Sequence, residues 1–107
     1  MPIHQITIIG TGLIGGSLAL ALRQHGFAGA IVGCDKRTVL ETALERKAVD
    51  RAEADLERAV AGSDVIVFAT PVGTILSQFE AIAPTLPSTT LVTDTGSTKQ
   101  KFVERAL

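Results

Sequence analysis

The chain has 107 residues, a length typical of one domain, and we treat residues 1–107 as a single unit. Its formal net charge of −1 and its aromatic content of 4%, without Trp or Tyr, argue against nucleic acid or an acidic membrane as a partner. Hydrophobic residues make up 46% of the chain and charged residues 20%, which is typical of a globular protein.

The opening residues and the cysteine content narrow the class of protein further. The segment MPIHQITIIG lacks the basic region of a secretory signal, and no apolar run reaches the length of about 18 residues that a membrane helix needs. The single cysteine, Cys34, excludes an internal disulfide, and no metal-ligand spacing surrounds it. We therefore expect a cytoplasmic protein without a metal site, in which Cys34 is a small buried residue.

Apolar runs alternate with amphipathic segments along the chain. The runs are continuous, which indicates strands of a parallel sheet that is buried on both faces. We predict a Rossmann-type α/β fold, a doubly wound parallel sheet in three αβα layers with right-handed crossovers. In chain order we expect a strand at 3–9, a helix at 17–24, a strand at 30–35, a helix at 38–47, a short strand near Val49, a helix at 56–61, a strand at 64–69, a helix at 73–83, a strand at 89–93 and a helix at 97–106.

Two of the predicted helices carry further signals. The first ends at His25-Gly26, where Gly26 suits the left-handed position after a helix. The apolar positions of helix 73–83 recur at helical spacing, which predicts a core-facing side. These positions are Ile75, Leu76, Phe79, Ile82 and Ala83.

Glycines separate the first predicted strand from the helix that follows it. Gly10, Gly12 and Gly15 form G-x-G-x-x-G, which in this context is typical of a site for a dinucleotide phosphate. Gly10 permits the tight turn, Gly12 removes a Cβ where pyrophosphate meets the backbone, and Gly15 lets helix and strand pack closely. The N–H groups of the first helical turn then face the phosphates. Gly16 has no comparable physical role, and a glycine-rich turn without a ligand is the alternative.

An acidic residue ends the second predicted strand at the distance expected for such a site, about 20 residues further on. Asp35 can accept hydrogen bonds from both hydroxyls of the adenosine ribose and would repel a 2′-phosphate. We therefore expect NAD as the cofactor in preference to NADP. Lys36 and Arg37 follow directly and could instead hold a 2′-phosphate, or they could be solvated turn residues.

Two more strand ends carry polar residues. Thr70-Pro71 follows the strand DVIVFA, and DTGS, from Asp94 to Ser97, follows TTLVT. Because ligands bind outside the carboxyl ends of parallel strands, we expect the nicotinamide half of the cofactor near these segments. Thr70 could bond the nicotinamide ribose or amide, or simply shape a turn. Asp94 and Ser97 could instead cap the last helix.

The two histidines are poor candidates for catalysis. His4 begins the first predicted strand and His25 ends the first helix, so both belong to the edge opposite the cofactor site. We expect both to be structural or exposed. Without a general base in view, the sequence predicts a cofactor site that lacks a reaction site.

Four segments together resemble the nucleotide-binding domain of the prephenate dehydrogenase family, which includes arogenate and cyclohexadienyl dehydrogenases. They are GTGLIGGSLALALR, GCD, SDVIVFATPVG and VTDTGSTK, and the resemblance runs from about Ile6 to Lys101. It implies NAD(P)-dependent oxidative decarboxylation on the path to tyrosine, with prephenate or arogenate as substrate. The residues implied in cofactor binding are Gly10, Gly12, Leu13, Ile14, Gly15, Asp35, Thr70 and Pro71. Ser97 is implied near the substrate hydroxyl and the nicotinamide.

The resemblance also implies parts that this sequence does not contain before Leu107. In the family, a histidine in a G-H-P-like segment handles the substrate proton, and a helical domain supplies carboxylate-binding arginines and the homodimer contact. We therefore expect this chain to bind the cofactor without turning over prephenate or arogenate. Two alternatives stay open, namely a stand-alone NAD-binding or sensing module and the cofactor domain of another small-substrate dehydrogenase, such as an imine reductase or a hydroxyacid dehydrogenase.

Overall fold

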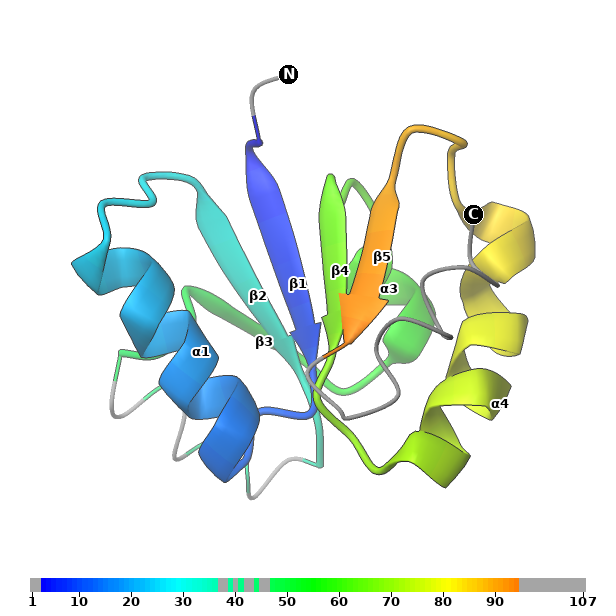
Figure 1. Ribbon diagram of the computed structural model, residues 1–107, viewed down its shortest axis with the longest axis horizontal. Helices are drawn as coiled ribbons and strands as arrows, with labels where there is room; N and C mark the ends of the chain where they lie inside the picture. The colour runs from blue at the N-terminus through cyan, green and yellow to red at the C-terminus, as the bar shows by residue number, and fades with distance from the viewer. Residues whose placement is uncertain (1–2, 37–38, 40, 42–43, 45–46, 95–107) are drawn as a thin grey trace.

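The computed structural model describes residues 3–36, 39, 41, 44 and 47–94, and the structural statements below concern these residues. Five strands form one parallel sheet in the order β3-β2-β1-β4-β5, which confirms the predicted Rossmann-type α/β fold. The elements are β1 (Gln5–Ile9), α1 (Leu13–Gln24), β2 (Ala30–Cys34), β3 (Arg51–Glu53), α3 (Leu56–Val60), β4 (Val65–Phe68), α4 (Val72–Ile82), the 3-10 helix η1 (Ala83–Thr85) and β5 (Leu91–Asp94) (Figure 1).

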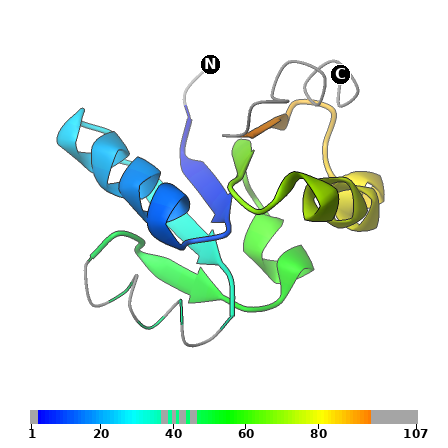
Figure 2. The ribbon, with the colours of Figure 1, turned by 60° about the horizontal axis from the view of Figure 1, so that its bottom comes forward.

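The sheet is buried on both faces because successive side chains of each strand point to opposite sides. In β1, Ile8 packs in the cluster beneath α1, whereas Ile9 packs in the cluster beneath α3 and α4. Val67 and Phe68 of β4 divide in the same way. Figure 2 shows α1 on one side of the sheet and α3 and α4 on the other, which is the predicted three-layer arrangement. None of the helices among the described residues is long and apolar enough to cross a membrane.

The structure moves the start of the first helix and locates the third strand. Helix α1 begins at Leu13 instead of Ser17, because Gly15 and Gly16 are part of the helix despite their low helix propensity. The third strand is Arg51–Glu53, just after the expected position near Val49. This strand has little apolar character of its own and is formed by pairing with Val32–Cys34 of β2.

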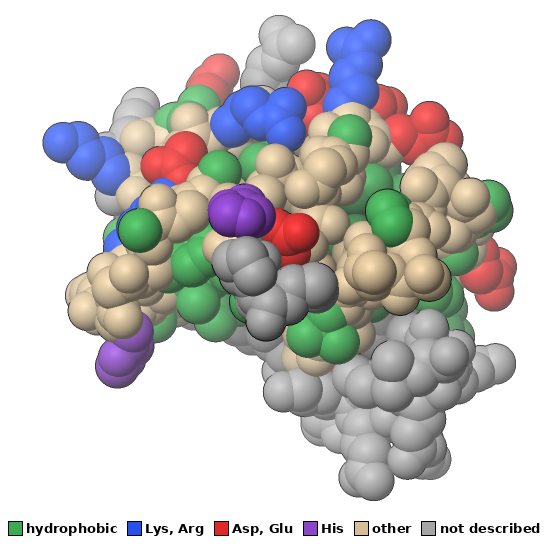
Figure 3. Space-filling model, turned by 90° about the horizontal axis from the view of Figure 1, so that it is seen from above, with side chains coloured by type: hydrophobic (Ala, Val, Ile, Leu, Met, Phe, Trp, Pro, Cys, Tyr) green, Lys and Arg blue, Asp and Glu red, His purple; other side chains and the backbone are tan. Residues whose placement is uncertain are grey.

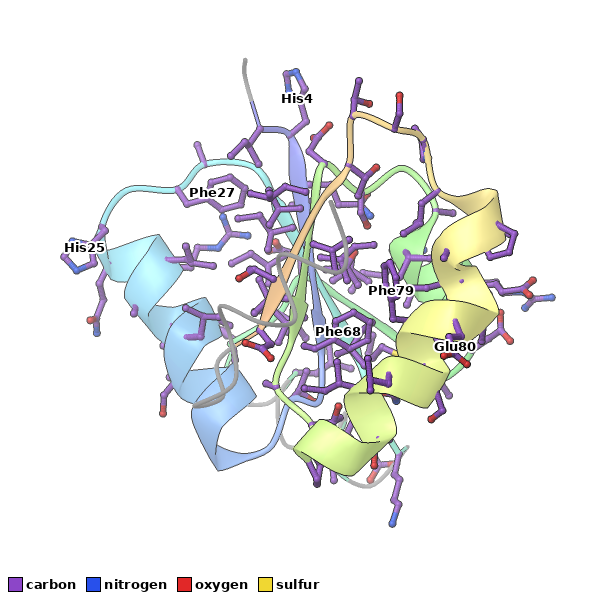
Figure 4. All side chains as sticks on the ribbon, turned by 45° about the vertical axis from the view of Figure 1, so that its right-hand side comes forward. His4, His25, Phe27, Phe68, Phe79 and Glu80 are labelled. Atoms are coloured by element: carbon purple, nitrogen blue, oxygen red, sulfur yellow. The ribbon has the colours of Figure 1, made fainter. Side chains whose placement is uncertain are left out.

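The second half of the chain follows the predicted pattern with smaller corrections. Ile75 and Ile82 of α4 are buried, but Leu76 is 38% exposed, so the core-facing side of this helix is narrower than the apolar pattern indicates. Figure 4 shows Phe79 of α4 and Phe68 of the sheet in the same layer, and both belong to one apolar cluster. Strand β5 begins at Leu91 instead of residue 89. The predicted helix at 97–106 and most of that at 38–47 lie outside the described residues.

The turn after α1 is tied to the sheet by one arginine. The backbone of Gly26 has the predicted left-handed conformation, with φ of 90°. Arg23 donates from Nη1 to the carbonyl oxygens of Phe27 and Gly29 at 2.8 and 2.7 Å, and its Nη2 forms an ion pair with Asp50. Asp50 in turn accepts the Ile31 N–H at 2.8 Å. This network holds the residues that lead into β2 against the end of α1.

A carboxylate holds the amino-terminal edge of the sheet. Asp64, just before β4, accepts the backbone N–H groups of His4 and Gln5 at 2.7 and 3.0 Å. These two hydrogen bonds lower the pKa of Asp64 below its ordinary value of 3.8. Because they favour the ionised form, they stabilise the fold only while the carboxylate stays charged.

We expect the stabilisation from Asp64 to be present above pH 3.8 and to be lost as the pH falls through the lower pKa of the folded state. The variant Asp64→Asn should therefore be less stable than the wild type at pH 7, and the difference should shrink at low pH. Urea unfolding over a pH series measures it. Glu80→Gln, an exposed carboxylate on α4, is the control. A difference for Asp64→Asn that does not vary with pH would contradict the assignment.

Candidate functional site

A cleft of about 640 Å³ opens at the carboxyl ends of β1, β2 and β4. Strands β2 and β3 lie on one side of β1, and β4 and β5 lie on the other, so the strand order reverses at this point. Parallel sheets of this kind bind ligands where the strand order reverses. The lining residues are Ile9, Gly10, Gly12, Cys34, Asp35, Lys36, Ala54, Leu56, Ala69, Thr70, Pro71, Thr74 and Gln78.

The strand pairing brings the separate sequence segments to this edge. Ile9 is level with Cys34 on one side and with Phe68 on the other, and Phe68 is level with Asp94. The residues that follow these strand ends therefore emerge side by side, although they are far apart in the sequence. This register is the reason that Gly10, Asp35 and Thr70 line one cleft.

Gly10 and Gly15 allow the turn between β1 and α1 to be this tight. Gly10 has φ of +93°, and a Cβ on it would lie 2.8 Å from Cγ2 of Thr70. A Cβ on Gly15 would lie only 1.8 Å from the carbonyl oxygen of Gly10, so no other residue fits there. The predicted roles of these two glycines, turn and close packing, agree with this geometry.

Gly12 differs because no described residue lies close to the position that its side chain would occupy. A Cβ on Gly12 would meet no atom within 4 Å, although this glycine lines the cleft. It also forms the N-cap of α1, which has no side-chain cap and no acidic residue in its first turn. The first intrahelical donor is Gly16, whose N–H reaches the Gly12 carbonyl at 2.8 Å. The N–H groups of Leu13, Ile14 and Gly15 precede it and suit an anion in the cleft.

Asp35 stands beside this turn at the end of β2. Its carboxylate accepts the Thr11 N–H at 2.7 Å through Oδ2 and the Lys36 N–H at 2.7 Å through Oδ1. Each carboxylate oxygen can accept a second hydrogen bond, so Asp35 can still take two ribose hydroxyls. The sequence did not reveal its bond to Thr11, which ties the glycine turn to β2.

The remaining wall next to Asp35 is largely neutral and apolar. Cys34 is buried as predicted, and it also lines the cleft. Burial raises the pKa of its thiol to about 11, and the carboxylates of Asp35, Glu53 and Asp55 act in the same direction. The thiol therefore stays protonated near neutral pH and acts as a small apolar group. Lys36 is exposed at the rim, and Arg37 lies outside the described residues.

The opposite wall comes from the end of β4 and from α4. Thr70 and Pro71 both line the cleft, as the strand-end argument predicts. Thr70 donates its hydroxyl proton to Oε1 of Gln78 at 2.9 Å. Thr74 and Gln78 also line this wall, and the sequence reading missed them. Their signal was a pair of polar residues at i and i+4, which share one side of the helix.

Neither histidine is part of the cleft. Figures 3 and 4 show both on the side of the molecule opposite the carboxyl ends of the strands, and both are exposed. Asp94 is 3% exposed, and its carboxylate oxygens have no hydrogen-bond partner among the residues that the structure describes. Ser97 lies outside the described residues. No group of acidic, histidine or cysteine side chains within the described ranges could hold a metal ion.

The family model and the curated relatives identify one family. The family model described as prephenate dehydrogenase, nucleotide-binding domain, matches residues 18–107. Prephenate dehydrogenase of Lactococcus lactis subsp. cremoris (strain MG1363) is 36% identical over 103 residues, which are 95% of this chain and 29% of that protein. The chain thus spans less than a third of the length of this relative.

Two solved structures extend the comparison to the fold. Prephenate dehydrogenase from A. aeolicus, in complex with hydroxyphenyl propionate and NAD+, has a TM-score of 0.86 and 27% identity, covering 91% of this chain and 35% of that one. Arogenate dehydrogenase from Synechocystis has a TM-score of 0.82 and 37% identity, covering 95% of this chain and 36% of that one. With its glycine turn, its strand-end acid and this match over most of its length, the chain belongs to the prephenate dehydrogenase family and corresponds to the nucleotide-binding domain of that family.

Proposed function

We propose that the chain binds NAD in the cleft and is the cofactor domain of an enzyme that oxidatively decarboxylates prephenate or arogenate. The observation that carries the proposal is that the uncapped start of α1, the open side of Gly12 and the carboxylate of Asp35 line one cleft. The pyrophosphate would lie on the first turn of α1, with N–H donors from Leu13, Ile14 and Gly15.

Each end of the cleft offers a different chemistry. Asp35 would accept the hydroxyls of the adenosine ribose, and its charge favours NAD over NADP. The nicotinamide half would lie toward Thr70 and Pro71, with Ser97 proposed near the substrate. NAD+ supplies the hydride acceptor when bound. The residues of this chain orient the cofactor and leave its nicotinamide end open toward the rest of the enzyme.

A binding module without turnover is the second candidate for this chain by itself. Among the described lining residues, the only ionisable groups are Cys34, Asp35 and Lys36. The thiol pKa of about 11 makes Cys34 a poor base near neutral pH, and Asp35 is engaged with two backbone N–H groups. Proton transfer from the substrate hydroxyl therefore needs a group from outside the described cleft. We also propose that the whole enzyme is a homodimer.

Gly12→Ala tests the phosphate site directly. The new methyl group lies within 4 Å of no atom of the described residues, so we expect stability within about 0.5 kcal/mol of wild type by urea unfolding. It would occupy the space where the pyrophosphate meets the backbone, so we expect NAD+ affinity to fall about tenfold or more by calorimetry. Gly16→Ala, whose Cβ makes an ordinary 3.5 Å contact with the Thr11 carbonyl oxygen, is the matched control. Unchanged NAD+ affinity in Gly12→Ala would place the phosphates elsewhere.

Cofactor preference is tested by removing the charge at Asp35. We expect the wild type to bind NAD+ more tightly than NADP+, and Asp35→Ser to shift the affinity ratio toward NADP+ by at least about tenfold. Asp55→Ser is the control, because it removes the same charge nearby while serine can keep the N-cap of α3. Equal or reversed wild-type affinities would show that Lys36 and Arg37 determine the preference.

A turnover assay tests the proposal that the reacting groups lie outside the described cleft. We expect the 107-residue protein to bind NAD+ but to form no NADH when prephenate or arogenate is added. Calorimetry on the same sample shows whether the cofactor site is intact, and NADH absorbance reports the reaction. NADH production by the pure chain would contradict the proposal that the reacting groups lie outside it.

A further inference from the structure

Thr70 is held from two sides at the point where β4 leaves the sheet. Its methyl carbon Cγ2 lies 2.8 Å from the position that a Cβ on Gly10 would occupy, so the methyl packs on the glycine turn. Its hydroxyl donates to Oε1 of Gln78 at 2.9 Å. Because a β-branched side chain has few rotamers, these two contacts fix the direction of the hydroxyl. Thr70 therefore joins the two walls of the cleft.

Gln78 reaches Thr70 because of its position on α4. Gln78 is half-buried, and it lies on α4 between the buried residues Ile75 and Ile82. Gln78 lies one helical turn after Thr74, and both line the cleft. The helix thus places a long polar side chain along the wall, back toward the end of β4.

The polarity of this hydrogen bond determines what Thr70 can recognise. Since the Thr70 proton is given to Gln78, the hydroxyl oxygen of Thr70 has only lone pairs left for a ligand. A ligand group at this position must therefore be a donor. Phosphate oxygens at neutral pH are acceptors only and are disfavoured here, whereas a sugar hydroxyl can donate.

We propose that Gln78 is a positioning residue that makes Thr70 a hydrogen-bond acceptor for a hydroxyl of the nicotinamide-side ribose. This inference rests on the proposed function, because it takes NAD as the ligand. The N–H groups at the start of α1 would then bind phosphate oxygens, which are acceptors, whereas the Thr70 oxygen would bind a ribose hydroxyl, which is a donor.

Three ligands that share one end and differ at the other test the proposal. ADP has the adenosine and pyrophosphate groups only, ADP-ribose adds the second ribose, and NAD+ adds the nicotinamide. In Gln78→Met, which keeps a long unbranched side chain without the acceptor, we expect the affinities for NAD+ and ADP-ribose to fall about fivefold while that for ADP stays unchanged. Ser77→Ala, an exposed residue on the same helix, is the control and should change none of the three.

A double-mutant cycle shows whether Gln78 acts through Thr70. Thr70→Val removes the hydroxyl and keeps the methyl, so Gln78→Met should cost no further affinity in the Thr70→Val background, whereas Thr70→Ser should retain ADP-ribose binding. Equal weakening of ADP, an unchanged affinity for ADP-ribose, or additive losses in the double variant would each overturn this inference alone. If the wild type bound none of the three ligands, the proposed function would be overturned as well.

Discussion

The contact between Gly15 of α1 and the carbonyl of Gly10 is the constraint on which the cleft depends. A Cβ at residue 15 would lie 1.8 Å from that oxygen, so the helix can begin this close to β1 only with glycine. The turn is then tied to β2 by the Gly10 N–H on the Cys34 carbonyl and the Thr11 N–H on Asp35, each at 2.7 Å. These bonds hold the start of α1 over the carboxyl ends of the strands.

The two ends of the sheet have different tasks in this molecule. At the amino-terminal edge, Asp64 accepts two backbone N–H groups, and Arg23 and Asp50 close the turn before β2. At the carboxyl edge, α1 and α4 both begin without a side-chain cap. The backbone N–H groups at these two helix starts are therefore not taken by a side-chain cap. This leaves backbone donors at the carboxyl edge for a ligand, as expected of a site built on a rigid scaffold.

The walls of the cleft differ in the chemical groups that they offer. Asp35 gives one wall a single anionic acceptor, and the protonated thiol of Cys34 beside it is neutral. Thr70 and Gln78 give the other wall neutral hydrogen-bonding groups. Such a cleft supports the proposed binding of a ligand with phosphate and sugar groups, and its described residues offer no base suited to proton transfer near neutral pH.

The sequence by itself determined the sheet, the three glycine positions of the turn and the acid at the end of β2, because each depends on local spacing and on the continuous apolar runs. It did not determine that β3 is Arg51–Glu53, since that strand is formed by pairing with β2 and has little pattern of its own. It placed Leu76 in the core, although packing leaves this residue 38% exposed. Only the tertiary structure placed Gln78 against Thr70, because strand register and helix direction together decide which side chains meet across the cleft.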